Sequence, residues 1–193
     1  ASLGYWRGRL AGAPGVVEVP GDRVRPVVPS FRGGVVRCGV DAVTVAGLRR
    51  VGGVVGATLF MVGLAAFQVL VARYARVSDV VVGCPAAGRD RVELEGLVGF
   101  FVNSLVMRAD LSGDPSFGEL VGRVRETDLA AYGHQDVPFE RVVEALNPVR
   151  SLARHPLFQV ELVFQNTDYE SATRAVSRLP GLTVAGEPAR VAA

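Results

Sequence analysis

The side chains of this 193-residue chain best suited to acid–base or nucleophilic chemistry are two histidines, His134 and His155, and two cysteines, Cys38 and Cys84. Hydrolytic catalysis needs a nucleophile, a base and a group that orients the base. Neither histidine has an aspartate four residues later, and the sequence contains no Gly-x-Ser-x-Gly elbow. The sequence therefore shows no recognisable complete active site.

The cysteines stand apart from one another and from both histidines, without the Cys-x-x-Cys spacing of zinc sites. We expect no metal site and no disulfide framework, and we expect the thiols of Cys38 and Cys84 to be buried, as is usual for free cysteines. Gly52 and Gly53 are not followed by Gly-Lys-Ser or Gly-Lys-Thr, so they do not predict a phosphate-binding loop.

The composition is that of a folded protein, with 49% hydrophobic and 21% charged residues. The net charge is only +2 and 7% of residues are aromatic, unlike a chain that gathers arginines and aromatic rings against nucleic acid. There are 36 valines but no isoleucine, and 21 arginines but no lysine, a bias expected of GC-rich coding in a bacterium. The first residues carry no apolar leader, so we expect a cytoplasmic protein.

The positions that must hold these side chains are predicted by the hydrophobic pattern, in which strands alternate with helices as in an α/β layer structure. Helices are expected up to Gly12, from Asp41, from Ala57, from an Asp114 cap with Pro115 in first position, and from Pro138. Strands are expected at 35–40, 79–84, 104–110, 157–165 and 182–184.

The segment 51–72 carries no charge and is flanked by arginines. A membrane span is one interpretation of such a segment. The other is a helix buried in a protein core, because the residues after Ala57 are apolar on more than one face and a valine-rich strand follows closely. We favour the core helix, and we expect Gly52 and Gly53 to weaken the helix that precedes it.

Four sequence motifs are specific and occur in a fixed order. They are YWRGRLAGAP at 5–14, VGFFVNS at 98–104, HQDVPFE at 134–140 and RSLARHPLF at 150–158. Together they resemble the C-terminal half of a nonribosomal peptide synthetase condensation domain, and the resemblance runs from about Leu3 to about Val184.

The resemblance implies the fold of chloramphenicol acetyltransferase, an α/β fold with a mixed β-sheet and packed helices, arranged as two lobes around a reaction tunnel. The HHxxxDG motif of the family belongs to the N-terminal lobe and does not occur in this sequence. We therefore predict that residues 1–193 are part of a condensation domain, with a linker into the lobe at 1–34 and the C-terminal lobe at 35–185.

In such domains the amine of an acceptor attacks the thioester of a donor and forms an amide. The resemblance implies that donor and acceptor arrive on phosphopantetheine arms of carrier domains, that an adenylation domain is adjacent, and that the domain itself binds no cofactor or metal, no nucleic acid and no membrane. Because the histidine motif lies outside this sequence, we assign no catalytic residue to the chain and expect it to be inactive alone.

The resemblance assigns a supporting role to Arg89, since an arginine at this place in the family pairs with the aspartate of HHxxxDG across the lobe junction. A solvated loop arginine is the alternative. Asn103 and Ser104 are candidates for the tunnel or cleft, because they lie where a loop enters a strand. Alternatively, Asn103 only ties a turn together by hydrogen bonds to the backbone.

The remaining motif residues are expected to be structural: Gly99, Phe101, His134, Gln135, Asp136, Pro138, Phe139, Arg154 and Pro156. We expect His134 to be a hydrogen-bonded structural residue between the lobes rather than a base. His155 stands where the family commonly has asparagine, so this chain lacks any side-chain contact that the asparagine makes.

Two other functions stay open within the same fold: a non-catalytic recruitment domain that binds a partner enzyme or carrier, and an epimerisation or heterocyclisation relative. An intact second histidine in the HHxxxDG segment favours catalysis, and a replaced one favours recruitment. A small membrane protein is a further alternative, which solubility without detergent would exclude.

Overall fold

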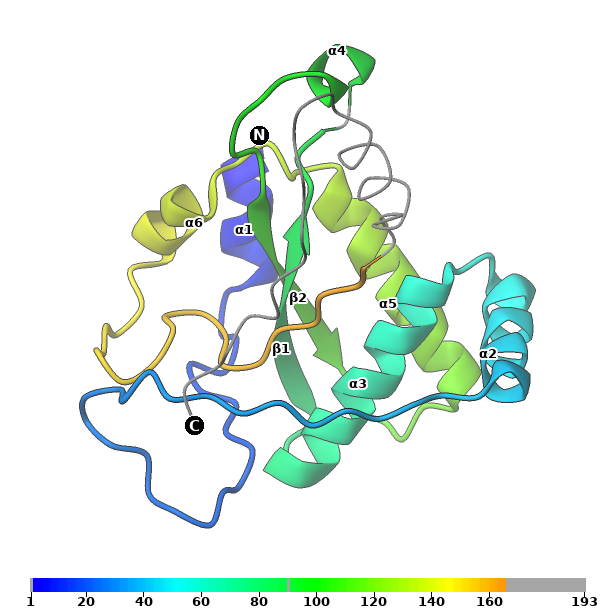
Figure 1. Ribbon diagram of the computed structural model, residues 1–193, viewed down its shortest axis with the longest axis horizontal. Coiled ribbons are helices and arrows are strands. Elements are labelled where there is room, and N and C mark those ends of the chain that lie inside the picture. Colours follow the sequence, from blue (N-terminus) through cyan, green and yellow to red (C-terminus); the bar gives the residue numbers. More distant parts are fainter. Residues whose placement is uncertain (1, 90, 166–193) are drawn as a thin grey trace, which may run out of the picture.

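The computed structural model describes residues 2–89 and 91–165 (Figure 1). Its helices are α1 (Ser2–Arg9), α2 (Ala42–Val55), α3 (Leu59–Ala75), α4 (Val92–Glu95), α5 (Phe117–Tyr132) and α6 (Phe139–Leu146), and its strands are β1 (Asp79–Ala86) and β2 (Asn103–Asp110). The strands predicted at 79–84 and 104–110 are confirmed, as are the helices expected after Asp41 and Ala57. The strand predicted at 182–184 lies outside the described residues.

β1 and β2 pair antiparallel, with Asp79 opposite Asp110 at one end and Ala86 opposite Asn103 at the other. The middle of both strands is buried without alternation: residues 80–82 and 105–107 are at most 2% exposed. Because successive side chains of a strand point to opposite faces, both faces of the hairpin are covered.

The helices supply that cover. α3 packs against β1 and α5 packs against β2, and the two helices pack against each other (Figure 1). α2 lies on α3 and α5, whereas α6 contacts both β2 and α1. The helices and the hairpin therefore share one core. Strands and helices alternate only from α3 to α5, because α1, α2 and α3 follow one another without a strand between them, so the predicted alternation holds only in this part of the described chain.

A third segment crosses the hairpin at Gly83. The N–H of Gly83 donates to the carbonyl of Val160 at 3.0 Å, and its carbonyl accepts from the N–H of Leu162 at 2.9 Å, which makes a parallel bridge to Glu161. A Cβ on Gly83 would lie 2.4 Å from the ring of Phe158, so the crossing requires glycine. The pairing around β1 is thus mixed, antiparallel on one side and parallel on the other.

Two predicted strands do not form as expected. The strand predicted at 157–165 reduces to the single bridge at Glu161, and Phe164 at its end is 44% exposed. The strand predicted at 35–40 is wrong: it is irregular in the structure, and Val36 is 94% exposed. A valine-rich segment favours a strand only where a neighbour supplies hydrogen bonds, and the described residues offer none there. Cys38 is exposed for the same reason, contrary to expectation.

The uncharged segment forms the α2–α3 corner. α2 runs through Gly52 and Gly53 to Val55, so the glycines do not shorten it as expected. A Cβ on Gly52 would lie 2.6 Å from the carbonyl oxygen of Ala57, so the tight turn into α3 accounts for this glycine. Among the described helices, none is by itself long and apolar enough to cross a membrane; α2 and α3 reach that length only together, bent by 103°.

The start of α5 differs from the prediction. Its cap is Ser116 rather than Asp114, which has a positive φ of 48°. The Ser116 hydroxyl accepts from the N–H of Glu119 at 3.3 Å, and the Glu119 carboxylate accepts from the N–H of Ser116 at 2.8 Å. This capping box satisfies two otherwise unpaired donors, and its Ser-x-x-Glu spacing is the signal that outweighs Asp-Pro.

Arg108, near the end of β2, fixes α1 to the hairpin. Its guanidinium binds the Asp79 carboxylate at 2.7 and 3.0 Å and donates to the carbonyls of Arg9 and Ala11 at 3.0 and 2.8 Å. Arg9 in turn donates to the carbonyl of Arg108 and, at 2.9 Å, to the hydroxyl of Thr127 on α5. The hydrogen bond to Asp79 raises the pKa of Arg108, so this anchor stays charged.

Candidate functional site

The side chain of Asn103 locks the first residue of β2 to the turn at 134–138, which we call the motif turn. Its amide nitrogen donates to the carbonyls of Gln135 and Val137 at 2.9 and 2.8 Å, and its amide oxygen accepts from the N–H of Phe139 at 3.0 Å. Pro138, at the cap position of α6, supplies no capping side chain. Asn103, on β2, therefore caps helix α6 and joins the motif at 98–104 to the motif at 134–140.

Helix α1 holds the motif turn from its other side. The indole N–H of Trp6 donates to the carbonyl of His134 at 2.9 Å, and the ring of Tyr5 stacks on the imidazole with 4.3 Å between ring centroids. The Nδ1 atom of His134 is buried and has no hydrogen-bond partner within the described residues. The structure places this histidine in packing, through its ring and its carbonyl.

The motif at 150–158 stacks onto the motif at 134–140. The ring centroid of Phe139 lies 5.1 Å from that of His155 and 5.8 Å from that of Phe158, and the rings of His155 and Phe158 are 3.9 Å apart. Burial lowers the pKa of His155, although the Glu161 carboxylate opposes the shift. Its imidazole is therefore favoured in the neutral form.

Two hollows flank the loop that carries this motif. One, of about 570 Å³, lies between the loop and residues 10–16 and reaches Val81 and Val106 of the hairpin. The other, of about 780 Å³, opens beside α6 and is lined by Ser104, Phe139 and residues 150–152, among others. Arg154, His155 and Pro156 contribute to both hollows. Apolar walls with a few polar groups are typical of a surface that holds a substrate.

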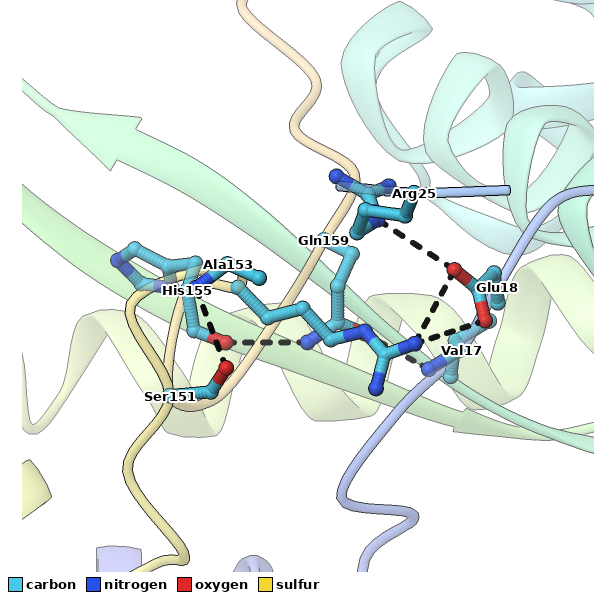
Figure 2. A network of polar contacts seen from close by, with 8 residues as sticks. Val17, Glu18, Arg25, Ser151, Ala153, His155 and Gln159 are labelled. Carbon is cyan, nitrogen blue, oxygen red and sulfur yellow. Dashed lines mark hydrogen bonds and ion pairs between the residues drawn. The ribbon is translucent and has the colours of Figure 1, made fainter. Parts of the chain in front are cut away.

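A group of contacts that we call the clasp binds this loop to the N-terminal segment (Figure 2). The Arg154 guanidinium pairs with the Glu18 carboxylate at 3.1 Å, and Arg25 adds a contact to the same carboxylate at 3.3 Å. The amide of Gln159 accepts from the N–H of Val17 at 2.7 Å and donates to the carbonyl of His155 at 3.1 Å. The clasp fixes the wall between the two hollows.

Arg89 organises residues 87–89 and 91–102, which we call the braced loop. Its guanidinium donates to the carbonyls of Leu94 and Leu97, the latter at 2.9 Å, and lies 4.3 Å from the centre of the Phe101 ring. Gly88 has a φ of 65°, and a Cβ there would collide with the carbonyl oxygen of Phe101. In the described chain, Arg89 is thus neither a bare solvated charge nor half of an ion pair.

Among the described residues, the site offers hollows and hydrogen bonds but no nucleophile paired with a base. Among residues 2–89 and 91–165, no group of three His, Cys, Asp or Glu side chains could hold a metal ion. Burial raises the pKa of the Cys84 thiol to about 12, and nearby carboxylates add to the shift, so this thiol stays uncharged. The backbone N–H of His134 donates to the carbonyl of Ala131, and the carbonyls of His134 and His155 accept from Trp6 and Gln159.

Sequence reasoning placed the right motifs together but missed their partners. Asn103, Ser104, Phe139, Arg154 and Pro156 gather at one end of the hairpin. Gly99, Phe101 and Arg89 lie in the braced loop, and the side chain of Asp136 makes none of the hydrogen bonds described above. Tyr5 and Trp6 belong to the motif at 5–14, but their contacts with His134 were not predicted, and Glu18 and Gln159 were not expected in the site at all. The hydrogen bonds of Trp6 with His134, of Arg154 with Glu18 and of Val17 with Gln159 join residues 128 to 142 positions apart. No local pattern signals such distant pairing.

The condensation-domain family model matches residues 1–188. A linear gramicidin synthase of Brevibacillus parabrevis is 53% identical over 85% of this chain, and the match covers 3% of that protein. A dimodular nonribosomal peptide synthase of Bacillus subtilis is 46% identical over 86% of this chain, or 7% of its own length. The chain thus spans a small part of the curated relatives that it matches.

Solved structures share the fold. The X-domain from teicoplanin biosynthesis, which has also been solved in a complex with OxyB, is 38% identical with a TM-score of 0.78, over 83% of this chain and 36% of that chain. A four-domain nonribosomal peptide synthetase bound to AMP and glycine is 29% identical with a TM-score of 0.85, over 94% of this chain and 14% of its own.

Proposed function

Because the chain belongs to the condensation-domain family of nonribosomal peptide synthetases, we propose that it forms one side of a tunnel in which an amide bond is made. The donor is an aminoacyl or peptidyl thioester and the acceptor is an aminoacyl amine, each on the phosphopantetheine arm of a carrier domain. The amine nitrogen attacks the thioester carbonyl, the new C–N bond replaces the C–S bond, and the displaced thiol takes up the proton that the amine loses.

The observation that carries this proposal is the meeting of three motifs at one end of the hairpin. Asn103 hydrogen-bonds the motif at 98–104 to the motif at 134–140, and Phe139 stacks on His155 of the motif at 150–158. The 780 Å³ hollow is lined by residues of all three, among them Ser104, Phe139 and Arg154. Such convergence of separate segments on one hollow is typical of a binding site.

In this proposal the residues of the chain bind and orient substrate, and the base for amine attack lies outside it. Residues 1–34 link into the lobe, residues 35–185 form the C-terminal lobe, and the HHxxxDG histidine comes from an N-terminal lobe. Ser104 faces the hollow as a contact for a carrier-bound substrate, while Asn103 positions the wall behind it. The chain by itself is then inactive.

Arg89 is proposed to support the catalytic segment by pairing with the aspartate of HHxxxDG. Its guanidinium is engaged by the carbonyls of its own loop, so the pairing requires exchange of one or more of these contacts. Exchange is favourable in principle, because a bidentate bond to a carboxylate is stronger than a bond to a neutral carbonyl.

The experiment compares the 193-residue chain with the domain extended by its N-terminal lobe. Both are incubated with two aminoacyl-loaded carrier domains, and the amide product is measured by mass spectrometry. We expect product from the extended domain and none from the chain alone or from an extended domain with the second HHxxxDG histidine replaced by alanine. Product from the chain alone would overturn the assignment of the base to the N-terminal lobe.

A recruitment domain is the second candidate function, and one specific observation favours it. The X-domain structures are 38% identical to this chain, and one of them holds OxyB. We propose as the alternative that the domain binds a partner enzyme and makes no bond. The same assay separates the two functions, since an extended domain that binds loaded carriers or a partner enzyme but yields no amide with any of them supports recruitment.

A further inference from the structure

Asp128, on α5, is a fully buried acid that the proposed function does not use. Its side chain is 0% exposed, and neither carboxylate oxygen has a hydrogen-bond partner within residues 2–89 and 91–165. A charged carboxylate in such surroundings loses its hydration without gaining a partner. Burial accordingly raises the pKa of Asp128 to about 7.

Three other titratable groups lie near this carboxyl: the buried Cys84 on β1 and the partly buried Tyr5 on α1 and Tyr132 on α5. Burial is the main cause of the raised pKa of each, and the charge of Asp128 adds to all three shifts. The Tyr5 hydroxyl is buried without a hydrogen-bond partner among the described residues. Asp128 therefore lies near side chains of α1 and β1, and its neighbour Thr127 accepts a hydrogen bond from Arg9 of α1.

Helix α1 is the weakest of these elements. It has only 8 residues, two of which are glycines, and a helix of this length is not stable alone. Its N-terminal half is attached through Tyr5 and Trp6, which contact His134. Its C-terminal end is attached through Arg9, which donates to Thr127 beside Asp128 and whose carbonyl accepts from Arg108. Any change at Asp128 that affects α1 will also reach the motif turn.

We propose that Asp128 is a proton-controlled switch for the docking of α1: the protonated acid allows α1 to pack on α5, and its ionisation releases α1 together with its hold on the motif turn. Release brings the carboxylate into contact with water, which restores its hydration. The switch concerns the packing of α1 and holds whichever reaction the domain performs.

The groups around α5 do not offer a ready counter-charge. The charged and titratable groups on the elements packed around it are Tyr5, Arg7 and Arg9 on α1, Arg49 and Arg50 on α2, Arg73 and Tyr74 on α3, Asp79 and Cys84 on β1, and Arg108 and Asp110 on β2. None of them appreciably lowers the pKa of Asp128, for which burial is the one cause resolved. Arg9 and Arg108, the cations closest to α1, already bind Thr127, Asp79 and backbone carbonyls.

The direction of the pH effect follows from linkage. With α1 docked, the pKa of Asp128 is about 7, and with α1 released it returns towards the ordinary 3.8. Between these values the docked form holds a proton that the released form has lost, so the equilibrium constant for release rises about tenfold per pH unit. Below this window both forms are protonated and above it both are ionised, so the constant is level there.

The test is amide hydrogen exchange of residues 5–10 in the 193-residue chain between pH 4.5 and 8.5, corrected for the intrinsic exchange rate. We expect the opening constant of α1 to rise about tenfold per pH unit up to about pH 7 and then to level off. In Asp128→Asn and Asp128→Ala the rise should vanish. Trp6 is the only tryptophan in the sequence and is 2% exposed, so its quenching by acrylamide reports the same opening.

One variant serves as the matched control. Glu126→Gln removes an exposed acid from the same helix and should keep the slope. A flat wild-type profile, an unchanged slope in Asp128→Asn, loss of the slope in Glu126→Gln, or equal opening of α5 amides would overturn the proposal.

Discussion

The motif at 98–104 passes from one kind of surroundings to another within seven residues. Its first half is outside: Val98 and Phe100 are 104% and 90% exposed, on a loop braced by Arg89. Its second half is inside: Asn103 makes three hydrogen bonds to the motif turn and α6, and Leu105, just beyond, is 2% exposed.

The difference teaches that one contiguous motif can have two tasks. The inner half builds the fold of this chain, because removing Asn103 would leave buried backbone groups without partners. The outer half has no such task among the described residues. Two ordered, exposed apolar side chains are typical of a surface that contacts another protein part, which fits the proposed contact with an N-terminal lobe.

The largest expected effect is the pH dependence that the buried carboxyl of Asp128 gives to the stability of the chain. Wild-type stability should fall as pH rises from about 4 to about 7, because the folded chain keeps the Asp128 proton that the unfolded chain has lost. A shift of this size corresponds to about 4 kcal/mol, which Asp128→Asn should remove from the pH dependence. Urea unfolding at about pH 4 and about pH 8 measures most of this difference, and parallel profiles for the two proteins would contradict it.

Removing the Asn103 amide should break the inner half directly. Asn103→Ala deletes three hydrogen bonds, including the cap of α6, and should lower the free energy of unfolding by about 3 kcal/mol. Ser104→Ala, at the next position, is the matched control and should cost less than about 1 kcal/mol. Equal losses in the two variants, measured by urea unfolding, would show that Asn103 does not hold the motif turn.

The clasp should matter less than the Asn103 lock. Gln159→Ala leaves the N–H of Val17 without a partner, and since Val17 is 2% exposed this should cost about 1.5 kcal/mol. Glu18→Gln weakens ion pairs at a carboxylate that is 44% exposed, so its cost should stay below about 0.5 kcal/mol. Thermal unfolding ranks the two, and the reverse order would mean that the ion pairs carry the clasp.

Substitutions in the outer half of the motif at 98–104 should leave the stability of the chain nearly unchanged. Val98→Ser and Phe100→Ser should each change the free energy of unfolding of the chain by no more than about 0.5 kcal/mol. In the extended domain the same changes should reduce amide formation or lower the stability of the joined lobes. Unchanged behaviour in both settings would remove the braced loop from the proposed lobe contact.

The hairpin and its covering helices could be predicted from sequence because their signals are local. Three consecutive valines at 80–82 indicate a strand buried on both faces, and the residues after Ala57 indicate a core helix. The prediction of a strand at 35–40 was wrong for a physical reason, since a high content of valine indicates a preference for a pleated surface but not the presence of a neighbouring strand.

The candidate site could be predicted only in part. The motif wording brought Asn103 and Phe139 to attention, but the hydrogen bond between them spans 36 residues and obeys no periodicity. Asp128 was not predicted at all, because a lone aspartate on a mostly polar helix is expected to face water. Its burial depends on which side of α5 meets α1, and that is decided by tertiary packing.

The clasp also has a consequence for synthesis of the chain. Val17 and Gln159 are 142 residues apart, so the N-terminal segment leaves the ribosome long before its partner exists. At about 5–20 residues per second, the wait is on the order of ten seconds. During that time Trp6 and Val17, both 2% exposed in the finished fold, lack the residues of this chain that bury them. Chaperone binding to the nascent chain should therefore include the segment around Trp6 and Val17 until the motif at 150–158 has emerged.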